Sequence, residues 1–207
     1  MKQICILVFV ITKLFSKIKQ TFLRFWWQAY GIGNLYYAKA NFSTIYFNGR
    51  CVTNLRGKVN FGKDIIINSS PFYCIDNDCC SKIIVSKDAN LSIGDFSGIS
   101  NTVIYTKQSI TIGNHVNIGA GCLIIDSNFH STDWNLRFDR TKDVQNAKNA
   151  PIEIKDLAFI GARSIICKGV TIGEHSIIAA GSVVACSVPD NELWGGVPAK
   201  FIKKSQL

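Results

Sequence analysis

The hydrophobic positions of residues 157–184 recur with a period of six. An aliphatic residue leads each unit, at Ile160, Ile166, Ile172, Ile178 and Val184. A small or β-branched residue follows four positions later, at Ser164, Val170, Ser176 and Ser182. This period differs from the roughly 3.6 residues of an α-helix and the roughly 2 of a half-buried strand. It predicts a chain that forms a short strand, turns a corner and repeats.

The two registers indicate which side chains face inward. We expect Ile or Val to fill the centre of each flat and a small side chain to occupy each corner, where less room remains. Gly161 and Gly173 follow the leading Ile of their units. We expect these glycines to relax the backbone where a corner needs an unusual φ. Hexapeptide repeats of this kind are a sequence signature of β-helices.

The same rhythm is present toward the N-terminus in a less regular form. Ile112, Ile118 and Ile124 make a clean run, whereas the earlier pattern is broken and is interrupted at 71–81. Imperfect repeats at one end are typical of the capping end of a repeat protein. We therefore predict a β-helix over residues 51–188. A capping tail over residues 189–207, with a turn and a short terminal element, is expected to follow it.

The rhythm stops between residues 126 and 150. This segment is polar, charged and aperiodic, and Ile152 and Ile154 then resume the strand pattern. A long loop that leaves a regular coil is more often functional than not. We therefore expect the chemistry of the protein to involve this extruded loop.

Residues 1–50 precede the repeats as an amphipathic and transition segment. The apolar run over residues 1–12 is too short to span a bilayer, and no clear small-x-small cleavage site of a signal peptide follows it. Residues 13–30 carry four cations and no acid, with apolar residues roughly along one helical face. Such a helix suits an anionic membrane interface, so we predict peripheral membrane contact through residues 1–30. Packing on the β-helix or on a neighbouring subunit is the alternative.

Composition limits the choice of partners. A length of 207 residues indicates one main domain. The net charge of +9 fits ordinary solubilising charge, an anionic membrane surface or a phosphate-bearing ligand. The chain has no recognised nucleic-acid motif, so we do not expect nucleic acid as a partner. Its eight cysteines lack the spacing of a metal site. We interpret them as reduced cysteines of a cytoplasmic protein, with disulfides as the alternative.

The chain has three histidines, of which one lies in the extruded loop. His115 and His175 fall at coil corners, where a solvent-facing role is expected. His130 opens the loop, four residues after Asp126 and three before Asp133. An imidazole can take a proton from an alcohol near neutral pH, and a carboxylate can fix its tautomer. A plain surface histidine is the alternative reading of His130.

The string IGEHSIIAAGSVV resembles the hexapeptide-repeat acyltransferases. This resemblance implies a mainly β fold, a left-handed parallel β-helix of three flat sheets, which usually assembles as a homotrimer with sites between subunits. The string IIDSNFH is similar to the site of family members that acetylate sugars. It implies His130 as general base, with Asp126 as the first candidate for its orienting partner and Asp133 as the second. The resemblance also implies Asn101 as a residue that contacts the acceptor.

The resemblance further implies acetyl-CoA as the donor, with no metal. The positions that correspond to the family's donor contacts are Gly161, Ala162, Ala180, Ala185, Lys200 and Lys203, with Lys204, Arg163 and Lys168 as further cationic candidates. The two lysines Lys200 and Lys203 would face the phosphates of CoA. Cys186 departs from the pattern, because a lysine is common there, and this puts one donor contact in doubt.

The function that follows is transfer of an acetyl group from acetyl-CoA to a sugar hydroxyl in surface polysaccharide biosynthesis, at the cytoplasmic side of the membrane. A serine-type or other small-molecule O-acetyltransferase is an alternative, although the N-terminal helical domain typical of serine acetyltransferases is not evident. A non-catalytic β-helix scaffold is a second alternative. A zinc enzyme of the γ-carbonic anhydrase type would need three converging histidines, and their spacing here differs from its motif.

Overall fold

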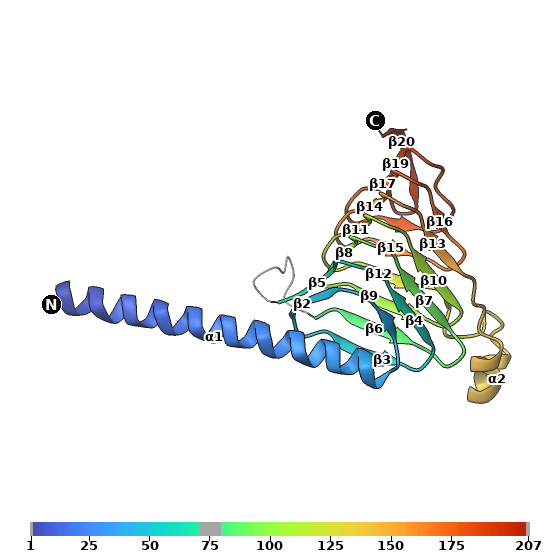
Figure 1. The fold of residues 1–207 in the computed structure, drawn as a ribbon. Coiled ribbons are helices and arrows are strands. Elements are labelled where there is room, and N and C mark those ends of the chain that lie inside the picture. Colours follow the sequence, from blue (N-terminus) through green and yellow to red (C-terminus); the bar gives the residue numbers. More distant parts are fainter. Residues whose placement is uncertain (1, 71–79, 206–207) are drawn as a thin grey trace.

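A computed structural model describes residues 2–70 and 80–205, with side chains from residue 12 onward. Most of the predicted interruption at 71–81 therefore lies outside the described residues. Within them the chain winds into a triangular prism whose walls are three sheets (Figure 1). Each turn of the chain adds one strand to each wall.

The three walls are called sheets A, B and C. Sheet A contains β1 (Asn41–Phe42), β4 (Lys58–Phe61), β7 (Asn90–Ile93), β10 (Ser109–Ile112), β13 (Ile152–Ile154) and β16 (Thr171–Ile172). Sheet B contains β2 (Ile45–Gly49), β5 (Ile65–Ser69), β8 (Gly98–Ser100), β11 (Asn117–Ile118), β14 (Phe159–Ile160), β17 (Ile177–Ile178), β19 (Glu192–Gly196) and β20 (Ala199–Lys204). Sheet C contains β3 (Val52–Leu55), β6 (Lys82–Val85), β9 (Val103–Thr106), β12 (Leu123–Ile125), β15 (Ile165–Ile166) and β18 (Val183–Val184).

Neighbouring strands within these sheets pair in parallel and in register, for example β10 with β13 and β12 with β15. The exception is the antiparallel pair β19–β20 at the C-terminal end. The predicted fold, a mainly β left-handed parallel β-helix with a helical N-terminus, is confirmed. Parallel pairing in register follows from the period of six, because each coil places equivalent side chains directly above those of the preceding coil.

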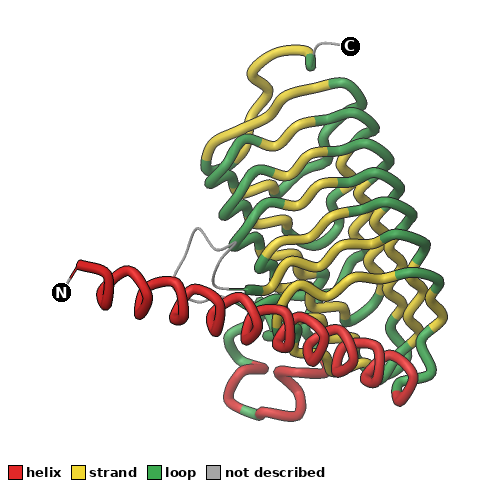
Figure 2. Tube along the Cα trace, turned by 60° about the vertical axis from the view of Figure 1, so that its left-hand side comes forward, coloured by secondary structure: helices red, strands yellow, loops and turns green. Residues whose placement is uncertain are grey.

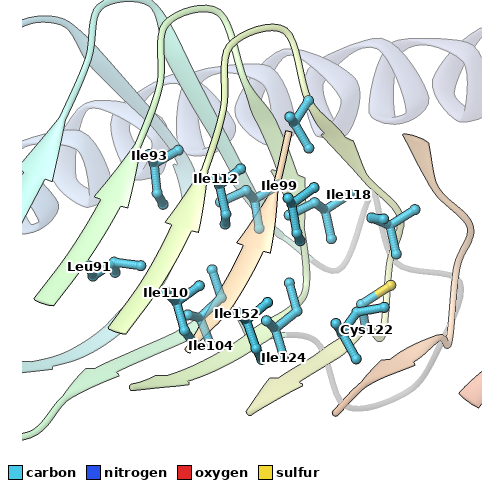
Figure 3. Packing of buried hydrophobic residues seen from close by; sticks show 14 of the residues in the cluster. Leu91, Ile93, Ile99, Ile104, Ile110, Ile112, Ile118, Cys122, Ile124 and Ile152 are labelled. Carbon is cyan, nitrogen blue, oxygen red and sulfur yellow. The ribbon is translucent and has the colours of Figure 1, made fainter. Parts of the chain in front are cut away.

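The core is a stack of aliphatic side chains that point into the prism. Figure 3 shows Ile104, Ile124, Ile110 and Ile152 from sheets C and A lying side by side in the interior. Each is at most 1% exposed, and burial of one such side chain contributes about 1.5–3 kcal/mol. The leading aliphatic residues of the six-residue pattern are therefore the core of the molecule.

The corners contain the small residues of the second register. The hydroxyl of Ser164 donates to the carbonyl of Gly161 at 2.8 Å, and that of Ser182 donates to the carbonyl of Ala179 at 2.6 Å. Both serines are fully buried. A buried hydroxyl needs such a partner, so serine satisfies the corner backbone as well as fitting the narrow space.

The expected role of the repeat glycines is wrong. Gly161 and Gly173 are not among the residues with positive φ, whereas His115 and His175 are. A side chain at Gly161 would instead meet the backbone nitrogen of Ala180, only 2.5 Å from the position of its Cβ. These glycines are needed because successive coils approach closely, and the left-handed corner positions accept other residues.

Three edges join the sheets. The AB edge contains residues 62–64, 94–97, 113–116, 155–158 and 173–176. The BC edge contains residues 101–102, 119–122, 161–164 and 179–182. The CA edge contains residues 56–57, 86–89, 107–108, 167–170 and 185–187. Backbone hydrogen bonds connect successive corners, such as the N–H of Gly121 to the carbonyl of Asn101. Residues of one edge therefore form a column along the prism.

Helix α1 (Lys2–Tyr37) closes the N-terminal end of the prism and then extends far beyond it (Figures 1 and 2). Leu35 is fully buried against the first coil. The side-chain amide of Gln28 donates to the carbonyl of Ile45 at 2.7 Å and accepts from the N–H of Phe47 at 2.6 Å. No helix in the described part of the chain combines the length and apolarity needed to cross a bilayer.

The strands begin at Asn41, inside the predicted N-terminal segment 1–50. At the other end, β19 and β20 continue sheet B as a hairpin over the last coil, with a cis peptide bond between Val197 and Pro198. The predicted tail 189–207 thus contains strands as far as Lys204, and residues 206–207 lie outside the described residues.

Candidate active site

The loop between β12 and β13 leaves and rejoins the prism at one point of the CA edge. Ser127 and Asn149 form an antiparallel bridge, and the N–H of Ala150 donates to the carbonyl of Asp126 at 3.0 Å. The loop contains a 3-10 turn, η2 (Leu136–Phe138), and a short helix, α2 (Arg140–Gln145). Figure 1 shows α2 hanging beside the lower coils. A closed root and internal helices give this loop a defined shape.

The loop brings His130 against Asp143. The Nδ1 atom of His130 lies 2.6 Å from Oδ2 of Asp143, and the other carboxylate oxygen accepts from the N–H of Ser131 at 2.8 Å. Asp143 lies in the first turn of α2, whose N-cap is the side chain of Asp139. The hydrogen bond from His130, and second that from Ser131, hold the pKa of the Asp143 carboxyl below its usual range. Asp143 is therefore ionised at neutral pH.

This pair leaves the other ring nitrogen of His130 facing outward. The imidazole side chain is 68% exposed, whereas Asp143 is 9% exposed. When Nδ1 donates its proton to the carboxylate, Nε2 of the neutral ring is an acceptor. A histidine that is oriented by a carboxylate and presents Nε2 to its surroundings has the chemistry of a general base.

The prediction that Asp126 orients His130 is wrong. Asp126 is fully buried, and its carboxylate accepts from the backbone N–H groups of Lys107, Gln108 and Ser109 at 2.7–2.8 Å. Burial raises the pKa of Asp126, and these three hydrogen bonds oppose that rise. The residue fixes the corner of the coil below the loop, which makes its role structural.

Asp133, the second candidate, does not contact His130 either. Its carboxylate accepts from the backbone N–H of Asn135 at 2.9 Å and so shapes the next turn of the loop. Sequence reasoning missed Asp143, because only the fold of the loop brings a residue thirteen positions away onto the ring. The N-cap pattern of Asp139 before α2 was the one signal that could have indicated a helix there.

Two further contacts hold the segment around His130. The ring of Phe129 packs edge-on against Tyr105 of β9, with 4.7 Å between ring centroids. The guanidinium of Arg137 donates to the carbonyl of Ser131 at 3.0 Å. His130 is thus placed beside the outer face of sheet C, close to the CA edge.

Most of the predicted donor and acceptor residues lie on the BC edge. Asn101, Gly161, Ala162 and Ala180 occupy corners of this column at different coils. Ala185 lies instead on the CA edge, after β18, with Cys186 beside it. Strands of sheet C separate the two edges by roughly 15 Å, at about 3.3 Å per residue. One chain therefore does not bring His130 and Asn101 together.

The predicted phosphate-binding lysines lie on β20. Lys200 and Lys203 are exposed and make no ion pair with any described residue. Lys204 binds Glu192 at 2.7 Å, and the indole N–H of Trp194 donates to the same carboxylate at 2.7 Å. Of the further candidates, Arg163 lies on the BC edge and Lys168 on the CA edge.

The remaining histidines lie on the AB edge, away from the loop. The ring of His115 stacks on Phe96, and His175 lies 3.8 Å from Glu174. The three histidines therefore do not converge as the zinc alternative requires. Within residues 2–70 and 80–205, no group of three potential metal-ligating side chains is found. The five described cysteines, Cys51, Cys80, Cys122, Cys167 and Cys186, are free thiols.

The chain is similar to several known acetyltransferases. Residues 151–186 match the profile of a family described as bacterial transferase hexapeptide (six repeats). The chain is 26% identical over 157 residues to the putative lipopolysaccharide biosynthesis O-acetyl transferase WbbJ of Escherichia coli K12, which covers 74% of this chain and 76% of that protein. It is 31% identical over 125 residues to the galactoside O-acetyltransferase of the same bacterium, which covers 59% of this chain and 58% of that protein.

A solved structure is also similar. The hexapeptide-repeat-containing acetyltransferase VCA0836 of Vibrio cholerae O1 biovar eltor, complexed with acetyl coenzyme A, is 37% identical with a TM-score of 0.51; the match covers 56% of this chain and 61% of that chain. The chain spans less than two thirds of that protein and of the galactoside enzyme. The resemblance to the hexapeptide-repeat acyltransferase family identified in the sequence is confirmed.

Proposed function

We propose that this protein transfers an acetyl group from acetyl-CoA to a hydroxyl group of a sugar, with His130 as the general base. The observation that carries the proposal is the His130–Asp143 pair, which turns Nε2 of the imidazole outward beside sheet C. Three relatives support it through their names: one is complexed with acetyl-CoA, and two are O-acetyltransferases of lipopolysaccharide biosynthesis and of galactosides.

The proposed reaction is a direct transfer. Nε2 of His130 accepts the proton of the sugar hydroxyl while the sugar oxygen bonds to the thioester carbonyl carbon. Asp143 stabilises the imidazolium that forms, and backbone N–H groups hold the oxyanion of the tetrahedral intermediate. Cleavage of the C–S bond then returns the proton from the imidazolium to the leaving thiolate. The products are an O-acetyl sugar and CoA with a free thiol.

The surface of the BC edge suits an extended donor. Gly161, Ala162 and Ala180 present almost no side chain, so a pantetheine arm could lie against the corner backbone. The exposed lysines Lys200 and Lys203 stand beyond the last coil and carry the positive charge that phosphates require. Ala185 lies on the CA edge, and we propose that it completes the site from another subunit.

We further propose that the protein works as a homotrimer with sites between subunits. The outer face of sheet A is polar, with side chains such as Thr111 and Glu153. Sheets B and C instead expose apolar side chains, including Ile66, Phe159 and Ile165. A second copy that packs on these faces would bring its BC edge, and hence Asn101, toward the His130 of its neighbour.

Helix α1 supports the proposal of membrane contact at the cytoplasmic face. Residues 12–26 are exposed apart from Gln20, because the helix projects away from the prism. Phe15, Phe22 and Phe25 are each more than 60% exposed, and the neighbouring side chains include cations but no acid. An apolar and cationic helix of this kind matches the surface of an anionic bilayer.

The direct test is release of CoA thiol by the purified full-length chain, measured with acetyl-CoA and a panel of sugars, amino acids and amines. We expect thiol release that depends on a sugar and yields an O-acetyl sugar by mass spectrometry. Replacement of His130 by Ala should lower kcat by about 10²–10⁴-fold without loss of the fold. Acetylation of amino acids or amines alone, or full turnover by the His130→Ala variant, would contradict the proposal.

A further inference from the structure

Three cations lie on successive coils of the CA edge, below the extruded loop. We propose that the acceptor carries an anionic group, a phosphate or a carboxylate, which binds to Arg56, Lys87 and Lys107. This inference rests on the proposed sugar acetylation and names the chemical class of its acceptor. The three residues are called the cation column.

The cation column is built by the register of sheet C. Leu55 pairs with Val85, and Val85 pairs with Thr106, in successive coils. The residues that follow these strands, Arg56, Ser86 with Lys87, and Lys107, therefore turn the same corner one above the other. Coils are about 4.8 Å apart, so the column extends roughly 10 Å downward from Lys107.

A groove of about 410 Å³ lies along this column. Its lining combines the three cations with Asn54, Ile84 and Tyr105. An amide, an aliphatic side chain and an aromatic ring beside clustered cations suit a sugar that bears an anion, because sugar rings have apolar faces and polar rims. The groove is large enough for about one or two sugar units by the general size of ligand pockets.

The groove opens beside the proposed general base. Tyr105 lines the groove and also packs against Phe129, the residue before His130. The loop that carries His130 starts one coil above Lys107. The proposed donor residues lie on the later coils, on the opposite side of His130 along the prism. An acceptor in the groove would therefore approach the imidazole from the side that the donor leaves open.

The charge of the cation column is not neutralised by described neighbours. Arg56, Lys87 and Lys107 make no ion pair with any residue in 12–70 or 80–205. Asp126 lies near Lys107, but its carboxylate is buried and accepts backbone N–H groups. Asp88 follows Lys87 in the chain and does not line the groove.

The opposite arrangement on the AB edge argues against random solubilising charge. There the corners carry carboxylates and amides that accept backbone N–H groups of the neighbouring coil, as Asp95 does from Lys63 and Asp156 does from Asn114. Those side chains serve the coil itself. Arg56, Lys87 and Lys107 on the CA edge instead line the groove.

The test compares three acceptors with the same free hydroxyls: a neutral hexose glycoside, its phosphorylated form and the corresponding uronic acid. We expect kcat/KM to be at least about tenfold higher for one or both anionic acceptors. Arg56→Gln, Lys87→Gln and Lys107→Gln combined should remove this preference through KM by about 10- to 100-fold and leave the neutral acceptor unchanged. The acceptor with the higher kcat/KM shows whether the cation column binds a phosphate or a carboxylate.

Lys63→Gln is the matched control, because Lys63 is a corner cation on the AB edge. The Lys63→Gln variant should leave the preference for the anionic acceptor unchanged. If the triple variant folds poorly, the single variant Lys107→Gln is a milder test of the same preference. Equal kcat/KM for neutral and anionic acceptors, or equal loss for both in the triple variant, would overturn this inference alone. Absence of thiol release with every sugar would overturn the proposed function, and the inference with it.

Discussion

The imidazole of His130 owes its orientation to a carboxylate thirteen residues further along the chain. Asp126 and Asp143 are both acids of this region, but their roles differ. Asp126 accepts three backbone N–H groups of a corner, whereas Asp143 contacts the imidazole of His130. The difference arises because Asp126 is buried at the corner directly after β12, whereas Asp143 lies in the first turn of α2, against His130. The two acids should therefore respond differently to the same substitution.

Asp143→Asn should lower kcat with little change in thermal stability. The amide oxygen can still accept from Nδ1, but it lacks the negative charge that stabilises an imidazolium, so we expect a loss of about 10²–10⁴-fold. Asp126→Asn should instead destabilise the fold by about 1–3 kcal/mol, because an amide accepts fewer of the three N–H groups. Thiol-release kinetics and thermal melts of both variants would distinguish the two roles. A larger kcat loss in Asp126→Asn at unchanged melting temperature would contradict this assignment.

At the scale of elements, the strands could be predicted where the period of six is strict. They could not be predicted in the early coils, where the period is irregular. Ile160 to Val184 repeat because every flat needs one aliphatic side chain inside. The first coils bury two large hydrophobic residues per strand in sheet B, as in Ile45 with Phe47 and Ile65 with Ile67. That alternation belongs to longer strands, and it hid the start of the prism at Asn41.

The interior of the loop could not be predicted from the sequence. No periodicity relates His130 to Asp143, since their contact depends on the bridge at Ser127–Asn149 and on the orientation of α2. His130, the proposed base, was identifiable because a family resemblance marked it. Its partner Asp143 was not identifiable, because nearness in sequence favoured Asp126. Contacts that depend on tertiary closure leave no local signal.

The C-terminal hairpin should confer a pH-dependent part of the stability. Its Lys204 and Trp194 contacts hold the pKa of Glu192 below its usual range. A carboxyl with a lowered folded-state pKa stabilises the fold above its unfolded pKa, about 4.3, and this contribution is lost as the pH falls through the folded-state value. Glu192→Gln should therefore lower the melting temperature at pH 7. The difference from the wild type should disappear in acid, where both side chains are neutral.

Thermal melts between pH 7 and pH 3 would measure this effect. Glu153→Gln is a suitable control, because Glu153 lies on the exposed outer face of sheet A. It should melt like the wild type across the range. A Glu192→Gln difference that persists unchanged at the lowest pH would contradict the proposed contribution.

Helix α1 should bind anionic vesicles through its exposed aromatic side chains. The combined change Phe22→Ser and Phe25→Ser removes two of the largest exposed apolar groups, each worth about 1.5–3 kcal/mol when buried, and should weaken binding at least tenfold. Cosedimentation with anionic and zwitterionic vesicles would measure the affinity. Tyr37→Ser is the control, because Tyr37 is exposed at the end of α1 beside the prism.

Equal binding to zwitterionic and anionic vesicles would remove the electrostatic part of this explanation. An unchanged affinity of the double variant would reject contact through this face of the helix. A double variant that changed the oligomeric state instead would assign the aromatic side chains to a second copy of the chain.

At the scale of the whole molecule, the separation of His130 from Asn101 predicts complementation between inactive subunits. In the proposed homotrimer, a mixture of His130→Ala and Asn101→Ala chains would contain some sites with an intact histidine from one subunit and an intact asparagine from the next. Random assembly gives about one quarter of such sites. Co-expression of the two variants should therefore restore about a quarter of wild-type turnover, although each variant alone is nearly inactive.

Mass analysis of the intact assembly would verify that mixed trimers form, and thiol release from the mixture would measure the restored turnover. Two copies of one variant, labelled with different tags, form the control and should remain inactive after mixing. Absence of any restored turnover in verified mixed trimers would show that the histidine and the asparagine do not work across subunits.

The position of α1 at the first coil has a consequence for access to the imidazole. The loop that carries His130 leaves the prism three coils above the first strand of sheet C, a height of about 15 Å at the spacing of adjacent strands. A bilayer held by α1 would lie below that height, while the end proposed to receive CoA would point into the surrounding water. A glycan that is still attached to its lipid would then need only a linker and one or two sugar units for its hydroxyl to reach His130 from the membrane.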